Sequence, residues 1–194
     1  MDRDSVSITL HVPKGREADL YNLIQKHPDI IPGFQFPYLY DTKQIFISYR
    51  RKDSEDVCGR IYDRLSAAFN NVFKDTEAIP AGVDFRFELE RAVAACNVML
   101  VIIGKQWDSA VHLRRLNDPN DFVRIEIEAA LKRDIPVIPV FVHRRTKMPD
   151  RKKLPPTLHP LTYRNARQAR PDPDFHRDLD GLIQDIQDIF DLIV

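Results

Sequence analysis

Between residue 44 and the C-terminus, short continuous apolar runs alternate with segments whose apolar residues recur every three or four positions. The continuous runs predict strands that are buried on both faces. They lie at residues 45–49, 71–73, 98–103 and 135–142. The recurrent spacing predicts amphipathic helices. These lie at residues 54–69, 84–95, 122–132 and 175–192. We expect one further short strand at residues 161–163 and a long loop before residue 122.

Strands that alternate with helices predict a parallel sheet with helices on both faces. Five strands in this alternation indicate an α/β, flavodoxin-like three-layer sandwich with the parallel strand order 2-1-3-4-5. In such a sheet, ligands bind beyond the carboxyl ends of the strands. We therefore expect a cleft among residues 49–51, 75–83 and 104–108.

Residues 1–43 follow a different pattern. Apolar and polar residues alternate from position 6 to position 12, as in a half-buried strand, and prolines interrupt an aromatic-rich stretch up to Tyr40. A segment of this size is too small to hold a core of its own. We divide the chain into an appendage with a linker, residues 1–43, whose function the sequence does not indicate, and a domain, residues 44–194.

Composition narrows the class of protein. Of the 194 residues, 43% are hydrophobic and 30% charged, which is typical of a folded globular protein. The chain has 29 Lys and Arg residues and 29 Asp and Glu residues, so its formal net charge is zero. This argues against nucleic-acid binding through bulk positive charge. The two cysteines, Cys58 and Cys96, cannot form a disulfide scaffold, which favours a cytoplasmic location. No apolar run is long enough to span a membrane, and the polar N-terminus is no signal peptide.

Several common α/β chemistries are excluded by missing motifs. The sequence has six glycines but neither the dinucleotide fingerprint nor a phosphate-binding P-loop. The central strand ends in Ile103-Gly104-Lys105 and lacks the phosphoacceptor aspartate of a receiver domain. No nucleophile elbow occurs, and the six histidines lack metal-ligand spacing. We therefore expect neither a metal nor a bound cofactor.

The helix at residues 122–132 carries two glutamates with different surroundings. Glu128 has Arg124 four residues before it and Lys132 four residues after it, as is usual on a helix surface. Glu126 has only apolar helical neighbours, which are Phe122, Val123, Ala129 and Ala130. An acid on an apolar face is costly unless it is hydrogen-bonded or serves a function. Two interpretations stay open, a hydrogen bond to the backbone of a neighbouring loop and a functional carboxylate.

Five segments, in this order and spacing, resemble Toll/interleukin-1 receptor (TIR) domains. Residues 46–51, Phe-Ile-Ser-Tyr-Arg-Arg, resemble the opening motif of the family. Residues 73–75 and 79–85 resemble the BB loop and the helix that follows it. Residues 117–127 resemble the catalytic-helix region of bacterial TIR domains, and residues 135–140 resemble the fourth strand. Residues 1–43 lie outside the resemblance.

The resemblance implies two classes of function. Many TIR domains hydrolyse NAD⁺ at the nicotinamide–ribose bond, in bacteria often in antiphage defence or as virulence effectors, whereas others are non-catalytic scaffolds. Glu126 matches the glutamate that enzymatic members carry on this helix, so the resemblance implies an NAD⁺ glycohydrolase that releases nicotinamide and ADP-ribose or a cyclic isomer. The alternative is a scaffold, adaptor or effector that acts through TIR–TIR contacts. An unrelated nucleotide-binding module is disfavoured by the missing phosphate loop.

One carboxylate is chemically sufficient for this reaction. Most glycosidases need an acid to protonate the leaving oxygen and a second carboxylate at the anomeric carbon. The pyridinium of NAD⁺ leaves as neutral nicotinamide without a proton, so the acid is dispensable. An anionic Glu126 then has only to stabilise the oxocarbenium-like ribose, which requires neither metal nor nucleophile.

Other residues are expected to contact NAD⁺ around the first strand end. Arg50 or Arg51 is a candidate for the pyrophosphate, although two solvated arginines are an equal alternative. Aromatic rings could stack on the nicotinamide or the adenine, and Phe85 also fits a core position. The complete predicted NAD⁺-binding set is Ser48, Tyr49, Arg50, Arg51, Phe85 and Trp107.

Charged residues are segregated along the C-terminal part of the sequence. A basic loop contains Arg144, Arg145, Lys147, Arg151, Lys152 and Lys153. After Pro171, Arg177 is the lone basic residue among the acids Asp172, Asp174, Asp178, Asp180, Asp185, Asp188 and Asp191. The two patches are either solvated faces or partners in head-to-tail association. The resemblance implies self-association, or contact with other TIR or sensor proteins, through the BB loop residues Asp75, Ile79, Pro80 and Gly82.

Overall fold

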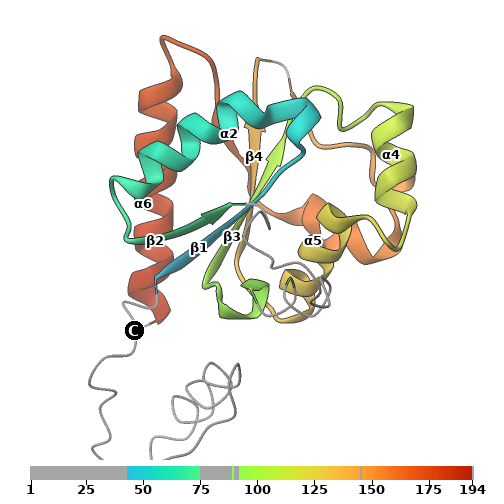
Figure 1. Cartoon of the computed structure of the whole chain (residues 1–194), viewed down its shortest axis with the longest axis horizontal. Coiled ribbons are helices and arrows are strands. Elements are labelled where there is room, and N and C mark those ends of the chain that lie inside the picture. Colours follow the sequence, from blue (N-terminus) through green and yellow to red (C-terminus); the bar gives the residue numbers. More distant parts are fainter. Residues whose placement is uncertain (1–42, 75–88, 90–91, 145, 194) are drawn as a thin grey trace, which may run out of the picture. The chain divides into compact units, whose positions relative to one another are not determined.

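The computed structural model describes residues 43–74, 89, 92–144 and 146–193 (Figure 1). The strands are β1 (Gln44–Ser48), β2 (Asn71–Lys74), β3 (Val98–Ile103), β4 (Val137–Val142) and β5 (Arg167–Ala169). The helices are α2 (Arg51–Ser66), α4 (Ala110–Asn117), α5 (Phe122–Lys132) and α6 (Phe175–Ile193), with 3-10 helices η1 (Arg151–Lys153) and η2 (Pro156–Tyr163). None of the described helices is both long and apolar enough to cross a membrane.

The strands form one parallel sheet in the order β2-β1-β3-β4-β5, which confirms the predicted fold class and strand order. β3 lies at the centre of the sheet, and all six of its residues are buried, as its continuous apolar sequence predicts. The register pairs Ser48, the last residue of β1, with Val101 of β3. The end of β1 therefore lies beside the central strand.

Alternating side chains of β1 enter two separate cores. Ile45 and Ile47 pack with residues of α2 and α6 on one face of the sheet. Phe46 packs on the other face, with Trp107 and with residues of α5 and η2. Figure 1 shows α2 and α6 on one side of the sheet and α4 and α5 on the other. Because Ser48 follows the same alternation as Phe46, its side chain points to the face covered by α5.

Two predictions between the regular elements are wrong. Residues 161–163 end η2 and form no strand, since Pro156 and Pro160 each lack the backbone N–H that a strand would donate. The fifth strand is β5, whose three residues include two exposed ones and therefore give no apolar run. The expected loop before residue 122 contains α4, which begins where Ser109 Oγ accepts a hydrogen bond from the N–H of His112.

Other expectations fall on residues outside the described ones. They are the whole predicted appendage apart from Lys43, the BB loop, and most of the expected helix at 84–95, of which residues 89 and 92–95 are described and helical. The division of the chain at residue 43 therefore stays a prediction.

Candidate active site

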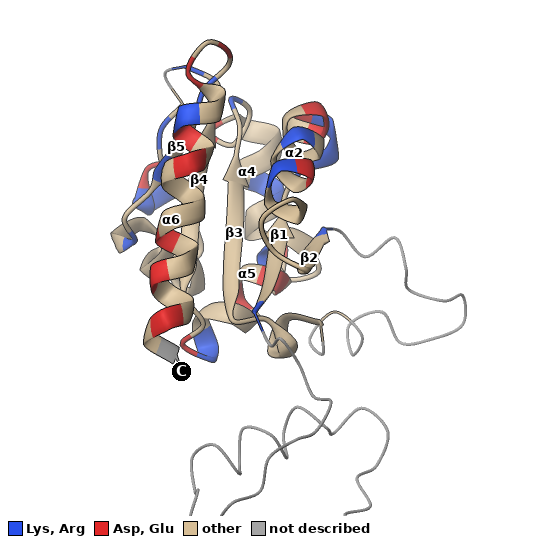
Figure 2. Cartoon of the chain, turned by 90° about the vertical axis from the view of Figure 1, so that its left-hand side faces the viewer, with Lys and Arg blue, Asp and Glu red and all other residues tan. Residues whose placement is uncertain are grey.

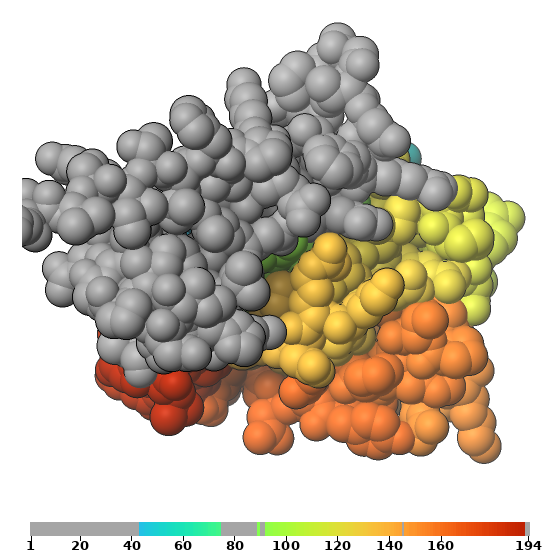
Figure 3. All heavy atoms as spheres, turned by 90° about the horizontal axis from the view of Figure 1, so that it is seen from below, coloured from blue at the N-terminus to red at the C-terminus, as the bar shows by residue number. Residues whose placement is uncertain are grey.

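Glu126 is held against the end of β1. The Ser48 hydroxyl donates a hydrogen bond to Oε2 of Glu126 over 2.5 Å, and the two residues are only 1% and 5% exposed. On its other flank α5 packs against η2, as Figure 3 shows with α5 in gold and η2 in orange. Among the described residues, the donor of this hydrogen bond is a side chain at a strand end. A buried carboxylate of fixed orientation at the carboxyl end of a parallel strand is the central feature of the site.

Asp121 determines where α5 begins. Its backbone is extended, and its Oδ1 accepts a hydrogen bond from the N–H of Arg124 over 3.1 Å, which is N-capping geometry. The same carboxylate accepts two hydrogen bonds from Arg50, over 2.9 Å from Nη1 and 2.8 Å from Nη2. The side chains of Arg50 and Asp121 are 2% and 3% exposed. Nε of Arg115 adds a fourth hydrogen bond to Asp121, over 3.2 Å.

These partners keep Asp121 ionised. Burial by itself raises the pKa of this carboxyl group. The hydrogen bonds and charge of Arg50, the N–H of Arg124 and the charge of Arg115 outweigh burial, and the pKa of Asp121 lies below its ordinary value of 3.8. The end of β1 and the start of α5 are therefore joined by a buried ion pair.

Asp53, whose N–H donates a hydrogen bond to the backbone oxygen of Arg50, reaches the end of β3 with its side chain. Asp53 Oδ1 accepts a hydrogen bond from the N–H of Gln106 over 3.1 Å. A Cβ on Gly104 would lie 2.1 Å from Asp53 Oδ2, so only glycine lets this side chain approach β3 so closely. Within the described part of the chain, five buried side-chain atoms have no hydrogen-bond partner, which are Nε of Arg50, Oδ2 of Asp53, Oγ of Ser54, Nε1 of Trp107 and Nδ1 of His112.

Four of the six residues predicted to bind NAD⁺ are buried or packed against a core. Ser48 and Arg50 are buried and bonded to Glu126 and Asp121. Trp107 is 1% exposed inside the core between the sheet and α5, and so offers no open ring face. Tyr49 packs against the core of α2 and α6, on the opposite face of the sheet from Glu126. Strand alternation and core packing decide where each of these side chains points, and NAD⁺ binding by the four residues stays a prediction.

The remaining predicted residues have other outcomes. Arg51 is exposed at the start of α2 and stays a candidate. Phe85 and the BB loop residues Asp75, Ile79, Pro80 and Gly82 lie outside the described residues.

Phe122 is a candidate that the sequence reasoning missed. Its side chain is 50% exposed, which is unusual for a phenylalanine, and it is the first residue of α5. Residues four apart lie on the same face of a helix, so Phe122 shares the face of Glu126. The spacing was visible in the sequence, but there it indicated only an apolar neighbour of the glutamate.

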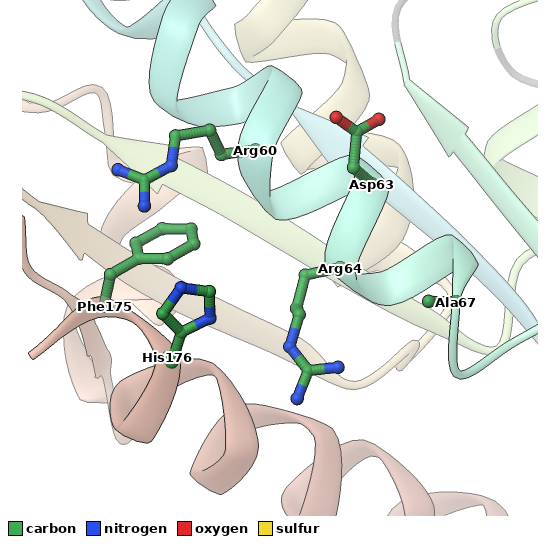
Figure 4. A pocket seen from close by; sticks show the side chains of 6 residues that line it. All are labelled: Arg60, Asp63, Arg64, Ala67, Phe175 and His176. Atoms are coloured by element: carbon green, nitrogen blue, oxygen red, sulfur yellow. The ribbon is translucent and has the colours of Figure 1, made fainter. Parts of the chain in front are cut away.

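A shallow hollow lies on the opposite face of the sheet, between α2 and α6 (Figure 4). It is lined by Arg60, Asp63, Arg64, Ala67, Phe175 and His176. The Arg60 guanidinium lies over the Phe175 ring at 3.9 Å from its centroid and also pairs with Asp172, and Arg64 pairs with Asp180. The hollow is separated from Glu126 by the sheet and is not part of the candidate active site.

Figure 2 shows acidic residues in red along α6, and five acids of the C-terminal segment form ion pairs with arginines from other parts of the chain. The ion pairs are Arg60–Asp172, Arg144–Asp174, Arg170–Asp178, Arg64–Asp180 and Arg167–Asp185. Arg177 is the lone basic residue after Pro171 in the sequence, but folding brings arginines from earlier in the chain to these acids. Because these acids are already paired within the chain, they offer little charge to attract the basic loop of a second copy. Self-association stays a prediction.

Comparisons with known proteins agree with the fold and the motif order. The family model described as TIR domain matches residues 45–183. NAD(+) hydrolase sarm1 of Drosophila melanogaster is 26% identical over 149 residues, which cover 76% of this chain and 10% of that protein. This chain thus spans about a tenth of the length of that relative.

Solved structures are similar at lower identity. The TIR domains of the activated Roq1 resistosome that directly recognizes the pathogen effector XopQ superpose with a TM-score of 0.53 at 18% identity, covering 74% of this chain and 98% of that one. A TIR-STING receptor from C. gigas gives a TM-score of 0.46 at 18% identity, covering 80% of this chain and 43% of the receptor.

Proposed function

This chain belongs to the TIR domain family, and from that premise we propose that it cleaves NAD⁺ between nicotinamide and ribose, with Glu126 as the catalytic carboxylate. The observation that carries the proposal is the buried hydrogen bond between Ser48 and Glu126. It gives an acid with apolar helical neighbours a fixed orientation beside a strand end. Similarity to an NAD(+) hydrolase supports the same reaction.

The geometry suits a reaction in which positive charge develops on the ribose. When the bond to nicotinamide breaks, its electrons pass to the pyridinium ring, which leaves as a neutral molecule. An oxocarbenium-like ribose remains, and a nearby anion stabilises it most where little water competes. Glu126 is 5% exposed and its carboxylate does not have to reorient, because Ser48 holds Oε2. Attack by water then gives ADP-ribose and a proton, and attack by the adenine gives a cyclic isomer.

Two exposed side chains are proposed to bind the rest of the substrate. Phe122, on the same helix face as Glu126, offers a ring on which the nicotinamide can stack. Arg51, at the start of α2, offers a guanidinium to the pyrophosphate. In this proposal Ser48 and Arg50 do not contact the substrate, and their effect on catalysis passes through Glu126 and Asp121.

The proposal is tested by chromatography of NAD⁺ incubated with wild type, Glu126→Gln and Glu128→Gln. Glu128→Gln is the matched control, since it removes the same charge from the same helix at a residue that pairs with Arg124 and accepts a hydrogen bond from Thr157. Wild type and Glu128→Gln should release nicotinamide, and Glu126→Gln should be slower by about 10²–10³-fold, the usual cost of losing one electrostatic stabiliser. Equal rates for Glu126→Gln and wild type, or no release by wild type at high protein concentration, would refute the proposal.

A non-catalytic scaffold is the second candidate. It is favoured by structural similarity to the TIR domains of an activated resistosome. Either function would serve in immune defence or signalling. Light scattering over a range of protein concentrations tests the scaffold, which requires assembly without consumption of NAD⁺.

A further inference from the structure

We propose that Arg50 and Asp121 are positioning residues for Glu126, which their buried ion pair holds in register with Ser48. This inference rests on the proposed NAD⁺ cleavage. Neither residue is assigned a contact with substrate. Each acts on catalysis through the placement of α5 against β1.

Two connections join the same two elements. Ser48 and Arg50 are two residues apart in extended backbone, so both side chains point to the α5 side of the sheet. Asp121, the N-cap of α5, and Glu126 within it are five residues apart, which corresponds to roughly 7 Å along the helix axis. Arg50 binds Asp121 and Ser48 binds Glu126. The ion pair fixes the start of α5 and the hydroxyl fixes its middle, so α5 can neither slide along β1 nor rotate away without breaking one connection.

The geometry of Arg50 favours positioning over substrate binding. Both Nη atoms donate to Asp121, and Nε is buried with no hydrogen-bond partner among the described residues. Its side chain is 2% exposed, so no donor faces an incoming phosphate. The planar guanidinium matches the two carboxylate oxygens and determines direction as well as distance, which a lysine at this position would not do.

Asp121 combines two tasks that a substitution can separate. As the N-cap it accepts a hydrogen bond from the N–H of Arg124, and as an anion it binds Arg50. Asparagine is as good an N-cap as aspartate but carries no charge. Asp121→Asn therefore keeps the start of the helix and weakens its attachment to β1.

Misplacement of a catalytic group by about 1 Å can cost about 10²-fold in rate. We expect kcat for NAD⁺ cleavage to fall at least about tenfold in Asp121→Asn, with KM little changed because the substrate contacts remain. Arg50→Lys should lose part of kcat in the same way. The matched control is Asp118→Asn, an exposed aspartate of the same loop whose Oδ1 accepts a hydrogen bond from the N–H of Asn120, and it should behave as wild type.

A milder variant guards against misfolding. Arg115→Gln removes the hydrogen bond from Arg115 to Asp121 at a side chain that is 48% exposed, so the fold should persist. It should lower kcat severalfold and leave KM unchanged.

The outcomes separate this inference from the proposed function. An unchanged kcat in Asp121→Asn and Arg115→Gln, with active wild type and inactive Glu126→Gln, overturns the positioning role alone. A raised KM with unchanged kcat also overturns it, since the pair would then bind substrate. No turnover by wild type overturns the proposed function, and this inference with it.

Discussion

Replacing Asp121 by asparagine removes one buried charge and leaves Arg50 without its counter-ion. Two hydrogen bonds of 2.9 and 2.8 Å join the residues, and both side chains are almost fully buried. Breaking a buried ion pair by removing one partner typically costs 3–5 kcal/mol. Asparagine retains the helix cap and one acceptor for Arg50, so we expect the lower end, a loss of about 3 kcal/mol in the free energy of unfolding.

Urea unfolding followed by tryptophan fluorescence measures this loss. Trp107 is the only tryptophan in the chain and is 1% exposed in the core between the sheet and α5, so its emission changes when that core opens. The midpoint should shift while the dependence on urea stays constant, because the surface exposed on unfolding is unchanged.

Two further variants make the prediction decisive. Asp180→Asn breaks an exposed pair with Arg64 and should cost at most about 1 kcal/mol. In the double variant Arg50→Met/Asp121→Asn, the loss should be smaller than the sum of the single losses, since no unpaired charge stays buried. A loss below about 1 kcal/mol for Asp121→Asn, equal to that of Asp180→Asn, would refute the importance of the buried pair.

Three other predictions follow from the same region and its surroundings. Burial, the charge of Arg50 and the charge of Arg115 lower the pKa of His112. The charge of Asp53 and a backbone hydrogen bond with Gln106 raise it, but the net effect is a pKa below 6.5. The unfolded chain therefore binds the proton more tightly than the folded chain, so the free energy of unfolding should fall as the pH drops below 6.5. The fall should be smaller in His112→Gln. Equal pH dependence of wild type and His112→Gln would contradict this. Gly104→Ala must displace Asp53 and should lower the free energy of unfolding by about 1–3 kcal/mol. Gly59→Ala places its new Cβ with no atom within 4 Å and should stabilise α2. Unfolding titrations in which Gly104→Ala is as stable as Gly59→Ala would contradict both expectations. Burial raises the pKa of the Cys96 thiol to about 12, and Cys58 is also buried, so a thiol reagent at pH about 8 should label both cysteines only after unfolding; rapid labelling of the native protein would contradict their burial.

The sequence predicted the sheet well because its strands are continuous apolar runs. β3 is apolar at every position and buried at every position, and such a run fits little besides the centre of a parallel sheet. β5 escaped prediction for the opposite reason, since an edge strand of three residues with two exposed side chains carries no apolar signal. α4 escaped because Asn117-Asp118-Pro119-Asn120-Asp121 indicates a turn, and the helix before that turn is only eight residues long.

The site was predictable in its helix and not in its partners. The apolar neighbours of Glu126 in sequence mark it as unusual, but that Ser48 is the donor follows only from the register of β1 against β3 and the packing of α5. Arg50 shows the same limit. Its place after a strand suggested a ligand, whereas the fold brings Asp121 to within 3 Å of its guanidinium from 71 residues away.

The most direct test of the central claim is the rate of nicotinamide release from NAD⁺, followed by proton NMR for wild type, Glu126→Gln and Glu128→Gln at equal concentration. Nicotinamide leaves whether the product is ADP-ribose or a cyclic isomer, so the measurement does not depend on the fate of the ribose. We predict release by wild type and Glu128→Gln and almost none by Glu126→Gln. Release by Glu126→Gln at the wild-type rate would show that the carboxylate held by Ser48 does not carry the reaction.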